Sequence, residues 1–208
     1  MPARSRILGA ALALVMVALV AGADVYPLRF ATRHASGIEV LQPLDIRRTA
    51  PMPAALQQTW GDATNLAMFR PELFGHPWVD PQAGEVVVGI ASAEGEALAR
   101  EWIDKGVRLT AFKTIDIPPP QAKVRLRDVP WSVLGMQNFM DEIIEFTRHS
   151  GVPGAERIWE MGPDPRNDRV IVTSDRVNDK LLFALAARFG AETIAFRVDP
   201  RAGPAQLL

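Results

Sequence analysis

The hydrophobic pattern of this chain is repeated: residues 80–112 are followed by a second copy at residues 164–196, at a constant offset of 84. Both copies show turn, strand, helix and strand signals in that order. Agreement between two independent stretches strengthens the assignment of each. The identical pairs are Asp80/Asp164, Pro81/Pro165, Val86/Val170, Val88/Val172, Leu98/Leu182, Gly106/Gly190, Ala111/Ala195 and Phe112/Phe196.

In the first copy, residues 80–84 predict a turn, because proline fixes φ and glycine permits a positive φ. Residues 85–90 are a β-branched run of strand length. Ser92 is a candidate helix N-cap and Gly106 a candidate helix stop, and a second strand is expected over 107–112. The predicted apolar face of this helix consists of Ala97, Leu98, Trp102 and Ile103.

The second copy predicts the same elements from different residues. The turn is expected at 164–168, the strand at 169–173, the helix at 175–189 and the closing strand at 192–198. Gly190 stands where this helix would stop. The predicted apolar face consists of Leu181, Leu182, Leu185 and Phe189.

The segment between the copies predicts a strand and a helix. Apolar residues alternate with Lys, Arg and Asp over 123–129, as in a half-buried strand. Ser132 is a candidate N-cap for a helix that runs to about His149. The broad apolar arc of this helix predicts that it is covered on two sides.

Upstream of the first copy the pattern is weaker. Residues 53–68 predict a short helix interrupted at Gly61 or Asp62. Residues 24–55 have little periodicity and scattered prolines, so they predict an extended arm, within which 28–34 and 38–46 are candidate short strands.

These elements together predict an α+β fold. It would contain two repeated strand-helix-strand units, a connecting strand and helix, and a mostly antiparallel sheet with helices packed on one face. The folded domain is expected over residues 56–199, followed by a tail at 200–208.

The first 23 residues predict an export signal. Arg4 and Arg6 precede an unbroken apolar run, residues 7–20, and Ala21-Gly22-Ala23 has the form of a cleavage site. The residues favour cleavage after Ala23, with a single uncleaved N-terminal membrane anchor as the alternative. Either way the rest of the chain is expected outside the cytoplasm, secreted or anchored to the membrane.

The composition excludes several kinds of chemistry. The net charge is -1 and the aromatic content is ordinary at 7%, so nothing indicates a nucleic-acid partner. The chain contains no cysteine, which rules out disulfides, thiolate metal sites and a cysteine nucleophile. A hydrophobic content of 48% is enough to form a core without such cross-links.

No catalytic, cofactor-binding or metal-binding constellation is predicted. His34, His76 and His149 lack the close spacing of metal ligands. Asp141, Glu142 and Glu145 lie together on one predicted helix, and we interpret them as its solvated face rather than as a general acid and base. We therefore expect a protein that is not an enzyme and needs no cofactor; catalysis through carboxylates is a weaker hypothesis.

Among the five tryptophans, Trp78 and Trp159 are the candidates for an interaction surface. Each precedes an Asp-Pro turn, in nearly equivalent places of the two copies. Aromatic side chains dominate many protein interfaces, so an exposed patch would be expected at these two positions. Trp102 lies on the predicted apolar face of a helix and is interpreted as structural.

Residues 77–199 resemble the pro-regions of bacterial secreted trypsin-like serine proteases of the streptogrisin and alpha-lytic type. The resemblance rests on the two Asp-Pro, Val-x-Val, helix, Gly, strand units and on "VRLRDVPWSVLGMQNFMDEI" and "VPGAERIWEMGPDPRNDRVIV". It implies a small domain of sheet and helices that assists the folding of a protease and inhibits it.

The resemblance does not extend to a protease domain, because the Gly-Asp-Ser-Gly-Gly stretch of such proteases is absent from this sequence. It therefore implies either a protease partner supplied in trans or a scaffold that is shared without the function, because fold does not fix function. The expected function is a non-catalytic, exported protein-interaction domain that inhibits or helps to fold a secreted protease, or binds an envelope protein. The alternative is a membrane-anchored structural or assembly component of the cell envelope.

Overall fold

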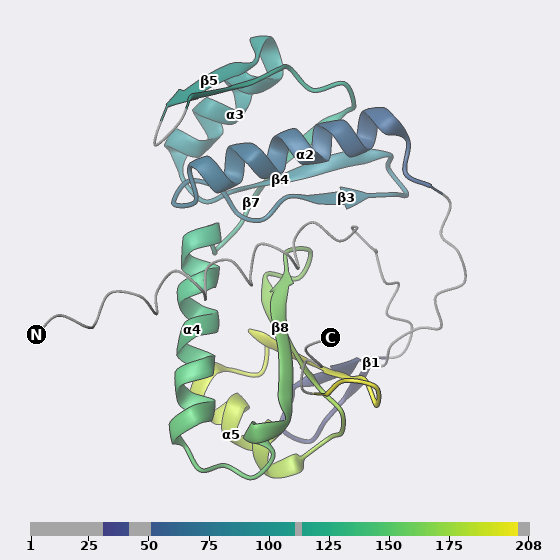
Figure 1. Cartoon of the computed structure of the whole chain (residues 1–208), viewed down its shortest axis with the longest axis vertical. Coiled ribbons are helices and arrows are strands. Elements are labelled where there is room, and N and C mark those ends of the chain that lie inside the picture. The colour runs from purple at the N-terminus through teal and green to yellow at the C-terminus, as the bar shows by residue number, and fades with distance from the viewer. Residues whose placement is uncertain (1–30, 42–50, 111–113, 204–208) are drawn as a thin grey trace, which may run out of the picture.

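The computed structural model describes residues 31–41, 51–110 and 114–203, and the predicted leader lies outside them. The described part of the chain contains four α-helices and ten strands in mixed, mostly antiparallel sheets, so the predicted α+β class is confirmed. Two lobes stand one above the other, each with its own sheet (Figure 1). Each lobe also has its own hydrophobic core.

The first lobe is built from residues 54–128. Its elements are α2 (Ala54–Phe69), β3 (Trp78–Asp80), β4 (Glu85–Ile90), α3 (Ala93–Lys105), β5 (Val107–Thr110), β6 (Thr114–Ile117) and β7 (Val124–Asp128). The central strand β4 is antiparallel to β3 and parallel to β7. Strands β5 and β6 form a separate antiparallel hairpin.

One face of the β3-β4-β7 sheet forms the core of the first lobe. Val86, Val88 and Ile90 alternate along β4 and belong to the same buried cluster as residues of α2 and α3. Trp102 of α3 is fully buried there, and its indole nitrogen donates to Pro118 O at 2.8 Å. Both helices of this lobe therefore pack on the same face of the sheet.

The second lobe combines an N-terminal hairpin with residues 133–198. Its elements are β1 (Ala31–Arg33), β2 (Glu39–Leu41), α4 (Val133–His149), a 3-10 turn (Ala155–Arg157), β8 (Ile158–Asp164), β9 (Arg169–Ser174), α5 (Asp179–Phe189) and β10 (Ile194–Val198). The strand order is β1-β2-β10-β9-β8, with β10 parallel to both neighbours. Val40, Val172 and Phe196 share a core with residues of α4 and α5.

Helix α4 joins the two lobes. Its first turn docks on the first lobe, where Val133 N donates to Phe74 O at 2.6 Å and Leu134 N donates to Pro71 O at 2.9 Å. From Met136 onward its buried residues belong to the core of the second lobe. The broad apolar arc predicted for this helix is explained by these contacts with both cores.

Four of the predicted helix ends are confirmed, but the helix predicted over 175–189 begins only at Asp179, where Asn178 is its N-cap. Ser92 Oγ accepts from Gly95 N at 3.1 Å, and Ser132 Oγ accepts from Gly135 N at 3.0 Å. Gly106 and Gly190 follow their helices with φ of 78° and 92°. Glycine carries no Cβ penalty at positive φ, which is why it can end both helices this way.

The two repeated units are alike but not identical. Both run helix, β-hairpin, helix, and then a strand parallel to the second strand of the hairpin: α2-β3-β4-α3 followed by β7, and α4-β8-β9-α5 followed by β10. In the first unit the β5–β6 hairpin is inserted before that last strand. The predicted strand 107–112 therefore starts as expected but pairs with β6 rather than completing the β4 sheet.

Two predictions upstream of the repeat are wrong. The segment interpreted as an arm outside the domain contributes β1 and β2, and Ile38 is fully buried in the second core, so the folded part begins before residue 56. Helix α2 runs without interruption through Gly61 and Asp62. Three-residue strands bury too few side chains to leave a periodic signal, and packing against β4 outweighs the cost of one helical glycine.

Two helical glycines give a matched stability test. A Cβ at Gly61 would meet nothing within 4 Å, so Gly61→Ala should raise the free energy of unfolding by about 0.5–1 kcal/mol. A Cβ at Gly95 would lie 2.5 Å from Leu73 O, so Gly95→Ala should lower it by roughly 1–3 kcal/mol. Urea unfolding measures both; equal effects of the two substitutions would contradict the packing of α3 on Leu73.

Candidate functional site

An open groove of about 720 Å³ lies at the β1 edge of the five-stranded sheet. Val40 and Val198 belong to the sheet face that carries the second core. Strand β1 is exposed along its whole length, and it is the last strand of the described sheet on this side. The groove is lined by Thr32, Arg33, His34, Ala35, Val40, Val177, Val198 and Pro200.

Large apolar side chains are exposed beside this groove. Val177, in the loop before α5, is 43% exposed, and Phe183 of α5 is 51% exposed. The Phe183 ring packs edge-on against His34, with ring centroids 5.4 Å apart. His34 Nε2 in turn lies 3.4 Å from Asp179 Oδ1 at the start of the same helix. His34, in the turn between β1 and β2, therefore covers this part of α5 only in part.

The internal repeat shows that this helix face is buried in the other unit. At the offset of 84, Phe183 corresponds to Ala99, which is 0% exposed. Helix α3 buries Gly95, Ala99 and Trp102, whereas α5 buries Leu181, Leu182 and Leu185. With 100° per residue, the buried stripe of α5 is rotated by about 120° relative to that of α3.

The cover of the α3 face comes from two segments of the first lobe. Gly95 packs against the backbone of Leu73, in the connection between α2 and β3. Trp102 is covered where the inserted β5–β6 hairpin returns toward β7, at Pro118. The second unit has no inserted hairpin between α5 and β10, and the face that carries Phe183 is left open.

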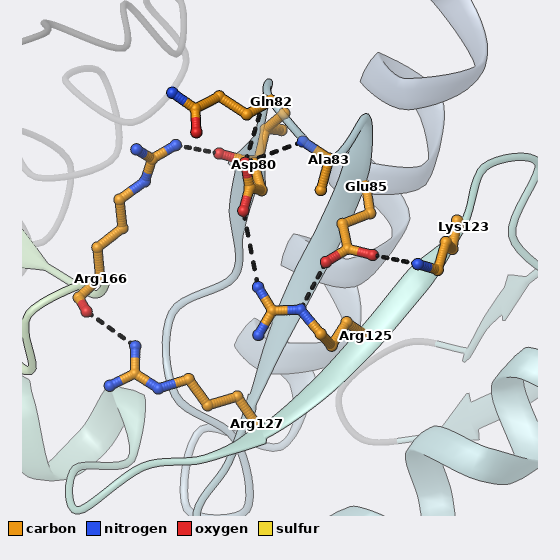
Figure 2. A network of polar contacts seen from close by, with 9 residues as sticks. Asp80, Gln82, Ala83, Glu85, Lys123, Arg125, Arg127 and Arg166 are labelled. Atoms are coloured by element: carbon orange, nitrogen blue, oxygen red, sulfur yellow. Dashed lines mark hydrogen bonds and ion pairs between the residues drawn. The ribbon is translucent and has the colours of Figure 1, made fainter.

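The face of the first sheet opposite its helices is charged (Figure 2). Glu85 of β4 has a side chain only 4% exposed, and it accepts from Arg125 Nε at 2.5 Å and lies 2.8 Å from Lys123 Nζ. Hydrogen bonds from Lys123, and next from Arg125, hold the pKa of Glu85 below its usual value. A second carboxylate, Asp80, lies 3.7 Å from Arg125 Nη2.

The turn between β8 and β9 reaches this charged face and connects the lobes. Arg127 of β7 pairs with Asp168 through Nη2, donates from Nη1 to Arg166 O at 2.8 Å, and lies over the Trp78 ring at 5.3 Å. Arg166 donates to Val79 O of the first lobe. The lobe junction, formed by these residues, is therefore held by one arginine from each side.

Asp168 occupies a backbone conformation that usually requires glycine. Its φ is 53°, and its counterpart Gly84 in the first unit has a φ of 62°. A non-glycine residue in this region costs roughly 1–2 kcal/mol. The ion pair with Arg127 is a gain that glycine at this position could not supply.

The two tryptophans predicted as an interaction surface do not form one patch. Trp78 lies at the lobe junction under Arg127, and Trp159 lies at the β-bulge that begins β8. At about 3.3 Å per strand residue, Trp159 is roughly 17 Å along β8 from the turn at Asp164. Both are partly buried, and the indole nitrogen of Trp159 is buried without a hydrogen-bond partner.

The sequence interpretation missed Phe183, Val177 and the junction residues Arg127 and Asp168. A usable signal was present in the repeat, because Phe183 and Asp168 are a large apolar and a charged residue where the first copy has Ala99 and Gly84. The predicted solvated face of α4 is confirmed, since Asp141, Glu142 and Glu145 point away from both cores.

Across 31–41, 51–110 and 114–203, no cluster of three or more His, Asp or Glu side chains has the arrangement of a metal site. None of the helices in these ranges is both long and apolar enough to cross a bilayer.

The chain matches no protein-family model and no curated protein. The resemblance to protease pro-regions therefore stays a prediction from the sequence motifs.

The Glu85 cluster predicts a pH-dependent effect. Because the pKa of Glu85 is lowered in the folded state, its stabilisation is present above about pH 4.5 and is lost as the pH falls. Glu85→Gln should therefore lower the urea midpoint at pH 7, and the difference from wild type should shrink at pH 3. Glu96→Gln, which breaks an exposed pair with Arg100, is the control and should have little effect at either pH.

Proposed function

We propose that this chain is an exported, non-catalytic protein-interaction domain that binds a partner protein at the groove along the β1 edge of the five-stranded sheet, beside α5. The observation that carries the proposal is the exposure of Phe183 at a helix position whose counterpart, Ala99, is fully buried. A large apolar side chain left open on a face that the same fold covers elsewhere is typical of a binding surface.

The form of the groove supports an extended polypeptide as the bound segment. Strand β1 presents an unpaired edge within the described sheet, and an added strand would satisfy its free backbone groups. Val177, Val40 and Val198 line the groove next to that edge, where apolar side chains of the added strand would be buried. In the first lobe, the corresponding helix face is covered by segments of the chain itself.

The partner class rests on the sequence. The predicted leader places the chain outside the cytoplasm, and the repeated units resemble protease pro-regions. A secreted serine protease, inhibited or helped to fold in trans, is therefore the partner that we propose first. Fold and motif alone do not fix function, so the partner must be tested directly.

The test compares two exposed apolar sites on the full chain. Wild type, Val177→Ser/Phe183→Ser and the control Leu134→Ser, whose parent residue is 46% exposed on α4, are used as baits in culture medium and envelope extract. Loss of one buried aromatic contact should weaken binding by about 10- to 100-fold. The dissociation constant and the rate of substrate cleavage are then measured with the purified partner.

We expect a serine protease to bind wild type and Leu134→Ser equally, to be slowed by both, and to bind the groove variant at least tenfold more weakly. Equal weakening by Leu134→Ser would contradict the groove as the binding site. Binding of an envelope protein without protease inhibition would contradict the protease partner but not the groove.

A further inference from the structure

The turn between β1 and β2 shows which backbone groups of β1 face the open edge of the sheet. His34 N donates to Ile38 O at 2.9 Å, so the N–H of His34 points toward β2. Peptide groups alternate in direction along an antiparallel strand. The next pair in the register, Arg33 with Glu39, is therefore not hydrogen-bonded within the hairpin. The N–H and C=O groups of Arg33, and two residues earlier those of Ala31, point away from β2 toward the edge.

A strand added at this edge would meet two different surfaces, one on each face of the sheet. Residues directly opposite each other on paired strands project to the same face. Thr32 lies opposite Val40, which belongs to the second core, and both line the groove with Val177. Arg33 lies opposite Glu39 and projects to the other face. Side chains of an added strand would alternate in the same way, between the apolar groove and the surroundings of Arg33.

Arg33 carries a charge that nothing in the described part of the chain neutralises. The residue is exposed, and it has no hydrogen-bond or ion-pair partner there. Its cross-strand neighbour Glu39 reaches in the opposite direction, past Ala195 of β10, and pairs with Arg169 of β9. Glu39 is therefore held on the side away from β1, and Arg33 is left at the edge without a counter-ion.

We propose that the segment bound at this edge carries an acidic side chain directly next to its apolar anchor: the anchor enters the groove beside Thr32, and the neighbouring Asp or Glu lies on the other face, where it pairs with Arg33. This inference rests on the groove proposed above and specifies which sequences that groove accepts. Because Thr32 and Arg33 are consecutive, the anchor and the acid are also consecutive, whichever direction the added strand runs.

The size of the preference follows from the exposure of Arg33. An ion pair between exposed side chains changes an equilibrium constant by about 1.5- to 5-fold. Replacing the acid of the bound segment by its amide should therefore weaken binding by about 2- to 5-fold. Replacing it by lysine should weaken binding further, because repulsion takes the place of attraction. Both differences should shrink at high ionic strength, since salt screens exposed charges.

A phage library of short random peptides tests the preference without a known partner. The baits are four forms of the full chain: wild type, Arg33→Glu, the groove variant Val177→Ser/Phe183→Ser, and the control Arg108→Glu. The parent side chain of the control is 73% exposed on the β5–β6 hairpin, and its substitution changes the net charge by the same amount as Arg33→Glu. Enrichment of residue types next to an apolar position is then compared among the baits.

We expect wild type and Arg108→Glu to enrich peptides with Asp or Glu directly beside an apolar residue. Arg33→Glu should instead enrich Lys or Arg at that position, and the groove variant should lose the apolar anchor as well. A second variant, Arg33→Gln, places no like charge opposite Glu39 and should lose the acidic preference without gaining a basic one. Fluorescence anisotropy then measures one enriched peptide and its amide form, at low and high ionic strength, against wild type and Arg33→Gln.

The outcomes separate this inference from the proposed function. Apolar enrichment that the groove variant abolishes, but with no acidic neighbour or with one that Arg33→Glu leaves unchanged, would overturn the inference and leave the groove standing as a binding site. Selection of the same peptides by the groove variant, or no enrichment by wild type, would overturn both. Self-association of wild type in sedimentation, abolished in the groove variant, would make a second copy the occupant and would overturn the inference.

Discussion

The pairing of Arg127 with the β8–β9 turn is the interaction on which the arrangement of this protein depends. Each sheet packs its helices on one face only, so the opposite face of the first sheet is left with charged residues that must be paired. Arg127 meets that requirement by bonding to the second lobe, at Asp168 and Arg166 O, while covering Trp78. The same side chain thus completes the outer face of one sheet and fixes the position of the other.

The features that the two repeated units share form the cores, and the features in which the units differ lie at surfaces. The repeated parts, β4 with α3 and β9 with α5, supply the two cores and end their helices in the same way at Gly106 and Gly190. The differences between the units lie at surfaces. The β5–β6 hairpin, present only in the first unit, covers α3, whereas α5 buries a different stripe than α3 does and leaves Phe183 exposed. At the lobe junction, Asp168 stands where the first unit has Gly84. The difference at α5 therefore coincides with the surface for which we propose a function.

The elements were predictable where local chemistry specifies them. Ser92 and Ser132 cap the helices that their sequence contexts predict, and the β-branched run before Ser92 and the alternating run before Ser132 form strands, because caps and alternation act over a few residues. Strands β1 and β2 were expected only as short candidates inside an arm, since β1 pairs with β2 and β2 in turn pairs with β10, more than 150 residues away. The groove and the junction depend on such long-range contacts, and neither was predicted.

The sequence by itself determined the class of fold, the two repeated units, the ends of their helices and the absence of thiol chemistry. These features follow from composition and from interactions within one turn or one strand. Only the tertiary structure decided that α3 buries Gly95 and Ala99 rather than Ala97, where β5 pairs, and that His76 and Asp168 line one cavity. Such outcomes depend on how the lobes pack, because the same amphipathic helix can bury different stripes against different neighbours.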